Sequence, residues 1–147
     1  MLKLSEIKEY VGEFAALISN STKVIHVVDD KDFANHTKDI SDEDHEFILV
    51  NVIPDFHAIS NDIDSMRLMP RIQFYIVQKT SSKAGNEKEM EILEQTQNAV
   101  EKIVNQMMAD IEKGNTCSFK VALSTINTEP VKNYHQTTGW VLSFELI

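Results

Sequence analysis

The sequence of 147 residues contains one cysteine, Cys117, four widely spaced glycines and no apolar run long enough to span a bilayer. A single cysteine excludes an intrachain disulfide bond and a zinc site built from several cysteines. Separated glycines exclude a glycine-rich phosphate-binding loop, and a membrane-spanning helix needs about 18 consecutive apolar residues. We therefore expect a protein that does not span a membrane and works in a reducing, non-secreted compartment.

Positive charge is also scarce, because 14 Lys and Arg residues stand against 23 Asp and Glu residues, for a net charge of -9. Nucleic-acid binding depends on clustered Lys and Arg side chains that neutralise phosphates, and the sequence contains no basic run. This balance argues against specific nucleic-acid binding and leaves solubility as the simplest role of the acidic surplus. The hydrophobic share of 42% and the charged share of 25% are typical of a globular domain.

Apolar residues recur every three or four positions in two segments, which predicts two amphipathic helices. The first covers residues 5–18 and the second covers residues 87–112. At 1.5 Å per residue the second helix is about 39 Å long, enough to cross a whole sheet. Its apolar stripe comprises Met90, Leu93, Val100, Ile103, Val104, Met107, Met108 and Ile111.

Five segments have the β-branched composition or the alternating apolar pattern of strands. They are residues 23–28, 46–53, 71–78, 118–126 and 138–146. The predicted order is therefore α-β-β-β-α-β-β, an α+β fold in which an antiparallel or mixed sheet carries both helices packed on one face. No repeat or linker divides the chain, so residues 1–147 are predicted to form a single domain.

The remaining segments are predicted to be loops. Residues 54–70 connect two strands, and a loop around Pro130 precedes the last strand. The segment 29–45 is acidic and poor in large apolar side chains, which favours a long solvated loop. Loops of that length often bind a partner. The acidic residues that we assign to this role are Asp29, Asp30, Asp32, Asp42 and Asp44.

The strand at 46–53 is an almost unbroken apolar run, so it needs cover on both faces or a contact with another subunit. One layer of helices covers only one face of a sheet. Apolar side chains on the other face would then be partly exposed in a monomer, and such a patch marks a contact surface. The predicted interface comprises Ile48, Val50, Val52, Tyr75 and Val77, with the acidic loop at its rim.

Candidate motifs for catalysis or metal binding are all incomplete. The five histidines lack the i, i+4 spacing of helical zinc sites. The acidic run at 29–32 does not match a calcium loop, because Ala34 and Asn35 occupy the positions of a ligand and a glycine. Cys117 is most simply a small structural thiol, and no serine stands in a Gly-x-Ser-x-Gly sequence. We expect no cofactor, no metal ion and no enzymatic activity.

The predicted order of elements resembles that of the tail-terminator proteins of tailed phages and related contractile particles. The closing strand at 139–146, with the sequence Gly-Trp-Val-Leu-Ser-Phe-Glu-Leu, is also similar to the C-terminal strand of such proteins. The resemblance implies a hexameric ring that ends the tail tube and meets neck proteins, in a virion or the host cytoplasm. It carries over no functional residue. An acidic channel wall would also let DNA pass without binding.

Two other functions fit the same sequence. The first is a non-enzymatic adaptor or regulatory domain, monomeric or dimeric, that uses its acidic loop against a basic protein. The second is a hydrolase or transferase whose site has no sequence motif. The mass of the assembled protein separates a ring subunit from an adaptor, and a deep pocket lined by His or carboxylate side chains would favour an enzyme.

Overall fold

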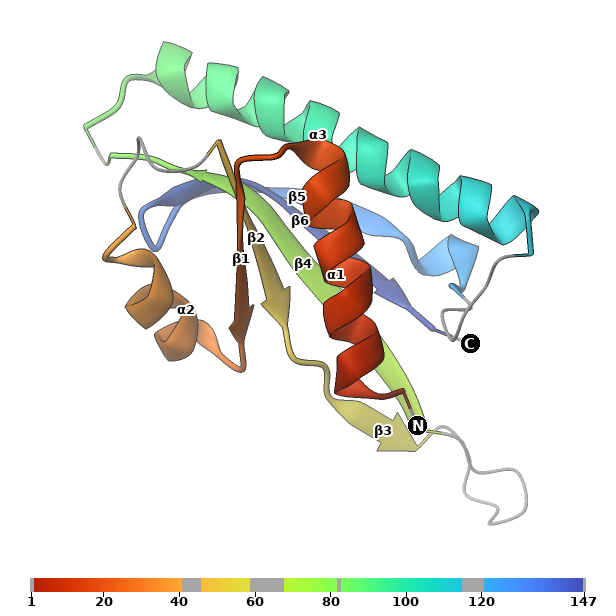
Figure 1. Cartoon of the computed structure of the whole chain (residues 1–147). Coiled ribbons are helices and arrows are strands. Elements are labelled where there is room, and N and C mark those ends of the chain that lie inside the picture. Colours follow the sequence, from red (N-terminus) through yellow and green to blue (C-terminus); the bar gives the residue numbers. More distant parts are fainter. Residues whose placement is uncertain (1, 41–45, 59–67, 82, 115–120, 147) are drawn as a thin grey trace.

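The computed structural model describes residues 2–40, 46–58, 68–81, 83–114 and 121–146 (Figure 1). Three helices and a mixed sheet confirm the α+β class. The elements in chain order are α1 (Leu4–Ile18), β1 (Thr22–Val27), α2 (Asp30–Thr37), β2 (Phe47–Val52), β3 (Phe56–Ala58), β4 (Leu68–Lys79), α3 (Asn86–Glu112), the 3-10 helix η2 (Leu123–Thr125), β5 (Asn127–Tyr134) and β6 (Thr137–Glu145).

The main sheet has the strand order β1-β2-β4-β6-β5, with β4 in the middle. Strands β1 and β2 are parallel because the chain crosses over through α2 between them, and the other neighbours are antiparallel. Among the described strands, the short strand β3 pairs with β4. Of the two sheet types expected from the sequence, the mixed one is found.

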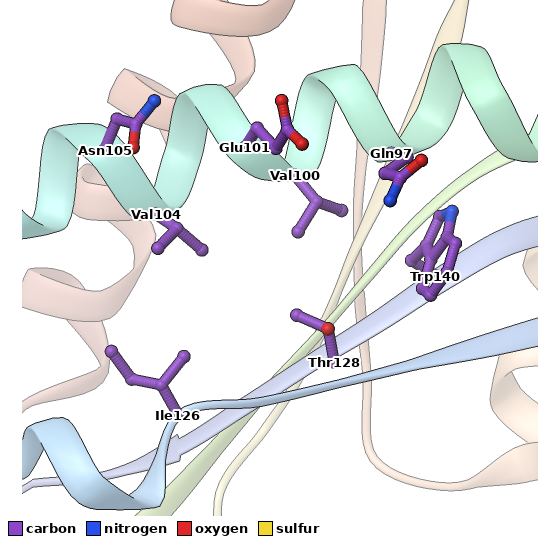
Figure 2. Close-up of a pocket in the computed structure, with 8 residues that line it drawn as sticks. All are labelled: Gln97, Val100, Glu101, Val104, Asn105, Ile126, Thr128 and Trp140. Carbon is purple, nitrogen blue, oxygen red and sulfur yellow. The ribbon is translucent and has the colours of Figure 1, made fainter.

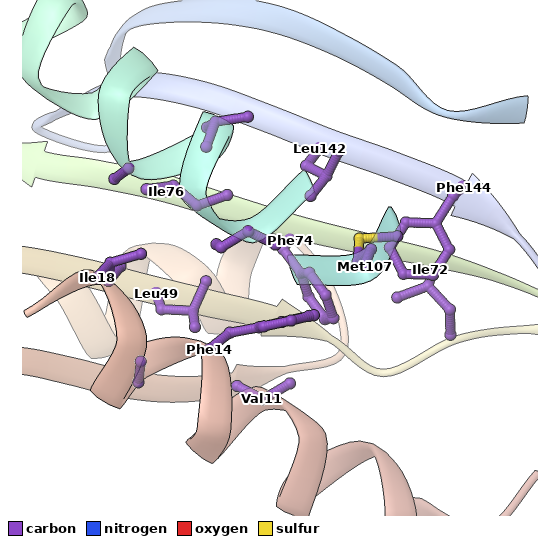
Figure 3. Packing of buried hydrophobic residues seen from close by; sticks show 14 of the residues in the cluster. Val11, Phe14, Ile18, Leu49, Ile72, Phe74, Ile76, Met107, Leu142 and Phe144 are labelled. Atoms are coloured by element: carbon purple, nitrogen blue, oxygen red, sulfur yellow. The ribbon is translucent and has the colours of Figure 1, made fainter. Parts of the chain in front are cut away.

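One face of the sheet is covered by α1 and α3, as the apolar stripes predict (Figure 1). Strand β4 sends Ile72, Phe74 and Ile76 into this core, and all three are fully buried. The Phe74 ring lies 6.0 Å from Phe14 of α1 and 5.8 Å from Phe144 of β6. Both contacts are edge-to-face, the arrangement that aromatic pairs prefer. Figure 3 shows this cluster, to which α3 adds Met107.

The buried face of α3 is rotated relative to the predicted stripe. Met90 and Met108 are exposed, whereas the buried set is Glu89, Ile92, Thr96, Ala99, Val100, Ile103 and Met107. Thr96 is tolerated in the core because its hydroxyl donates to the carbonyl of Ile92 at 2.7 Å. A count of apolar residues alone overlooks polar side chains that bond within their own helix.

The second face of the sheet is covered by α2, which corrects two predictions. Residues 30–37, inside the segment predicted to be a loop, form a helix, and the helices do not all pack on one face. The helix begins because the Asp29 carboxylate accepts a hydrogen bond from the backbone N–H of Asp32 at 2.8 Å. Its one large apolar side chain, Phe33, is buried against the sheet. A two-turn helix with one anchor gives too little periodicity to be recognised.

The region before the last strand also differs from the prediction. Within the expected strand 118–126, Val121 forms a single bridge with Leu146 and residues 123–125 form η2, while residues 118–120 lie outside the described part. The strand is β5, at the position where Pro130 suggested a loop. Likewise the expected loop 54–70 contains β3 and the start of β4. Strand 138–146 is confirmed as β6.

Gly139 lies where β6 passes closest to β4. A Cβ atom at this position would meet the carbonyl oxygen of Ile76 at 2.2 Å and the Cα atom of Val77 at 2.8 Å. Both are backbone atoms of the central strand and cannot move aside alone. The glycine is therefore needed for the spacing of the two strands.

Candidate functional site

The predicted apolar interface is largely buried within the single chain, so its expected exposure is wrong. Ile48 is 1% exposed, and Val50 and Val77 are 0% exposed. Val52 and Tyr75 are partly buried. The physical reason is α2, whose Phe33 lies on this face with its ring 5.0 Å from that of Tyr75. No neighbouring subunit is required to cover these side chains.

Beside Phe33, an aromatic cluster joins α2 to the β5–β6 hairpin. The rings of Tyr75 and Tyr134 are stacked at 5.5 Å, and Phe33 meets Tyr134 edge-on at 5.3 Å. The Tyr134 hydroxyl donates to the Asp30 carboxylate. Burial raises the pKa of both phenols, and the Asp30 carboxylate raises the pKa of Tyr134 further. Both phenols stay protonated near neutral pH, so the cluster acts as a packing contact.

The acidic residues assigned to a binding loop are partly used inside the chain. Asp29 caps α2, Asp30 accepts from Tyr134, and Asp32 lies 3.1 Å from Nε2 of His36. Asp32 also accepts a hydrogen bond from the backbone N–H of Val28 at 3.0 Å. The two remaining residues, Asp42 and Asp44, lie outside the described part. The three described acids hold α2 in place.

The turn between β5 and β6 stores backbone strain. His135 and Gln136 have φ angles of 50° and 64°, left-handed values that cost energy for residues other than glycine. The turn is held by Thr37 Oγ1, which donates to the His135 carbonyl at 3.2 Å, and by Thr80 N–H, which donates to the Gln136 carbonyl at 2.8 Å. A glycine-free sequence gives no signal for such a turn.

A second polar pair lies between β1 and β2. Nδ2 of the buried Asn51 is 3.1 Å from Nδ1 of His26, while Oδ1 of Asn51 has no partner among the described residues. Burial lowers the pKa of His26, and the positive charge of Lys8 on α1 lowers it further. The imidazole is therefore neutral near pH 7 and ties the two strands together. Among the described residues, no group of three His, Cys, Asp or Glu side chains could hold a metal ion.

A pocket of about 340 Å³ lies between α3 and the β5–β6 edge of the sheet (Figure 2). We call it the α3–β5 pocket; its lining residues are Gln97, Val100, Glu101, Val104, Asn105, Ile126, Thr128 and Trp140. Val100, Val104 and Ile126 make it apolar inside, and Glu101 supplies the one formal charge among its lining residues. Trp140 is fixed because its Nε1 donates to the carbonyl of Leu93 at 2.9 Å. The pocket suits an apolar side chain.

The β5 edge of the sheet is poorly suited to pair with a further strand, because a proline faces outward there. The backbone N–H and carbonyl of Glu145 in β6 are directed toward the β5 side of that strand. The N–H donates to Thr125 Oγ1 and the carbonyl accepts from Ala122 N–H, both at 2.9 Å. Backbone direction alternates along a strand. By the observed register, the β5 residues that bond to β6 are Asn127, Glu129 and Val131. Thr128 and Pro130 therefore face outward, and Pro130 has no N–H to offer a further strand.

The β1 edge, in contrast, is open within the part of the chain that the structure describes. The carbonyls of Ser21 and Val27 accept hydrogen bonds from the β2 side at 3.3 and 2.7 Å, so odd-numbered residues of β1 face β2. The residues that face outward are Thr22, Val24 and His26. Their backbone groups have no partner within the described residues. The next outward N–H, that of Val28, is already bonded to Asp32.

Comparison with known proteins gives no relative from which a function could be transferred. No protein-family model, no curated protein and no solved structure matches the chain. In the described part of the chain, no helix is both long and apolar enough to cross a membrane. Among the described residues, the α3–β5 pocket and the β1 edge are two surfaces at which a partner could bind.

Proposed function

We propose that the chain is a structural assembly subunit of a phage-tail-like particle, a tail-terminator ring protein that caps the tail tube and joins it to the neck. The order of the elements carries this proposal. When α2, β3 and the 3-10 helix η2 are set aside, the chain runs through one helix, three strands, one long helix and two closing strands. This skeleton is the one on which the resemblance to tail terminators rests.

A ring needs a head-to-tail contact between two different surfaces of the subunit. The α3–β5 pocket is suited to be one of these surfaces, because it is apolar inside and lies beside an exposed edge strand. An apolar side chain of a neighbouring subunit would be desolvated there. The net charge of -9 supports the same role, because a negative ring wall does not hold passing DNA.

Sedimentation with tail tubes tests the proposal. The tubes are assembled from a tail-tube protein of the same genome, and the purified chain is added in increasing amounts. We expect the chain to pellet with the tubes and to saturate at a fixed number of copies per tube, six for the hexamer that the resemblance implies. A chain that stays in the supernatant, or binds along the tube without saturating, would contradict a terminator.

A matched pair of variants tests the pocket. Val104→Glu places a charge among the apolar lining residues, and we expect at least a tenfold loss of tube-end binding. The control is Lys102→Glu on the same helix, where the side chain is exposed and outside the pocket. Equal loss in both variants would show that charge on α3, rather than the pocket, matters.

A further inference from the structure

We propose that the open edge of β1 pairs with β1 of a second copy of this chain, in an antiparallel and two-fold symmetric arrangement. The contact is different from the head-to-tail contact of a ring, so it stands or falls independently of the proposed function. It would join the main sheets of two chains into one continuous sheet.

The spacing of the free backbone groups fits a two-fold axis. Thr22, Val24 and His26 face outward at every second position, and a symmetric pair centres on Val24. Val24 then lies opposite Val24 of the second copy, and Thr22 lies opposite His26. In an antiparallel ladder, each such pair exchanges both N–H to carbonyl bonds. Every free group that β1 offers on this edge obtains a partner.

The charges beside the edge are complementary in the same register. Lys8 is close enough to His26 for its charge to lower the pKa of that imidazole, after the larger effect of burial. At the other end of β1, the Glu46 carboxylate accepts from Ser19 Oγ at 2.6 Å. Since His26 of one copy lies opposite Thr22 of the other, Lys8 of one copy faces the Glu46 end of its neighbour. Symmetry provides this attraction twice.

The helix layer also permits the approach. On α1, Gly12 follows Lys8 by four residues and lies on the same stripe of the helix. A Cβ atom added to Gly12 would meet nothing within 4 Å, so this side of α1 is open. The surface of α1 beside Gly12 therefore has room for part of a second copy.

A second copy of this chain is favoured over an unrelated strand for two reasons. Its β1 edge has backbone groups at the matching spacing, and it places a charge of opposite sign beside Lys8 and beside Glu46. The β5 edge of another copy is a poor alternative. Pro130 faces outward there and would leave one acceptor of β1 without a donor. The pairing is thus self-complementary, as a two-fold contact requires.

Hydrogen exchange resolved to single amides tests the backbone pairing. At low concentration, the amides of Lys23, Ile25 and Val27 are protected by β2, and those of Thr22, Val24 and His26 exchange fast. At high concentration, we expect the second set to slow by at least tenfold while the first set changes little. Fast exchange of the second set at every concentration would overturn the proposal.

Charge reversal tests which chain is the partner. Lys8→Glu and Glu46→Lys should each raise the dimer dissociation constant about tenfold, because like charges then meet twice. The double variant should return to within about threefold of the original value. Sedimentation equilibrium measures all three, with circular dichroism to confirm folding and Lys102→Glu as the control. A double variant that associates no better than the single variants would overturn the two-fold register. Val104→Glu should leave dimerisation unchanged, which separates this contact from that of the ring.

Discussion

Replacing Phe33 by alanine tests whether α2 is held on the sheet by one side chain. Phe33 is 1% exposed, and its ring lies 5.0 Å from Tyr75, 5.3 Å from Tyr134 and 5.3 Å from His135. Truncation of a buried phenylalanine costs about 3–5 kcal/mol in unfolding free energy. We expect a value near 3 kcal/mol, because a helix of eight residues at the protein surface can shift to fill part of the space.

The assay is equilibrium unfolding in urea, followed by fluorescence of Trp140, the only tryptophan. A hydrophobic dye provides a second measurement, because loosening of α2 uncovers Ile48, Val50 and Val77. The control is Val28→Ala, which removes a side chain that is 65% exposed and should change stability by less than about 0.5 kcal/mol. A Phe33→Ala loss below about 1 kcal/mol, without dye binding, would refute the anchoring of α2 and restore the exposed-face interpretation.

Three further perturbations follow from individual contacts. Gly139→Ala should destabilise the protein by about 3 kcal/mol or more in the same urea assay, because its Cβ meets the Ile76 carbonyl at 2.2 Å; a neutral result would mean that β4 and β6 lie further apart. The pKa of Glu89 is lowered, and the largest cause is the hydrogen bond that the Lys132 side chain donates to its carboxylate. The stability that this carboxylate contributes is therefore present above its unfolded pKa and lost as the pH falls through the lower, folded pKa. Glu89→Gln should abolish this loss of stability at low pH. If stability depends on pH in the same way in the variant, the Glu89–Lys132 pair contributes nothing to it. Burial lowers the pKa of His26 in the folded protein, so stability should decline as the pH falls below 6.5, the ordinary pKa of histidine. His26→Gln should flatten this decline in a series of melts at different pH values. An identical decline in the variant would assign it to another group.

The sequence predicted those parts of the fold that have long, regular patterns. Helix α1, the long α3 and the alternating strands β4 and β6 bury enough apolar side chains at fixed spacing to be recognised. The packing of α1 and α3 on one face of the sheet was predicted from the same pattern. The α+β class is confirmed for this reason.

The missed elements depend on tertiary contacts. Helix α2 forms because Asp29 caps it and Phe33 anchors it, and an acidic segment with one aromatic residue does not reveal either contact. Strand β5 was missed because Pro130 argues against a strand unless its missing N–H faces an open edge. The expected exposure of Ile48, Val50 and Val77 was wrong because α2 was missed, and α2 covers the face on which these side chains lie. The open β1 edge needed the hydrogen-bond direction of each residue, which composition does not contain.

The most direct test of the assembly claim is electron microscopy of tail tubes after incubation with the purified chain. The account predicts a single ring of added density at one end of each tube, formed by copies of this 16.8 kDa chain, and lost with Val104→Glu but kept with Lys102→Glu. Tube ends that remain bare at saturating concentrations of the folded protein would contradict it.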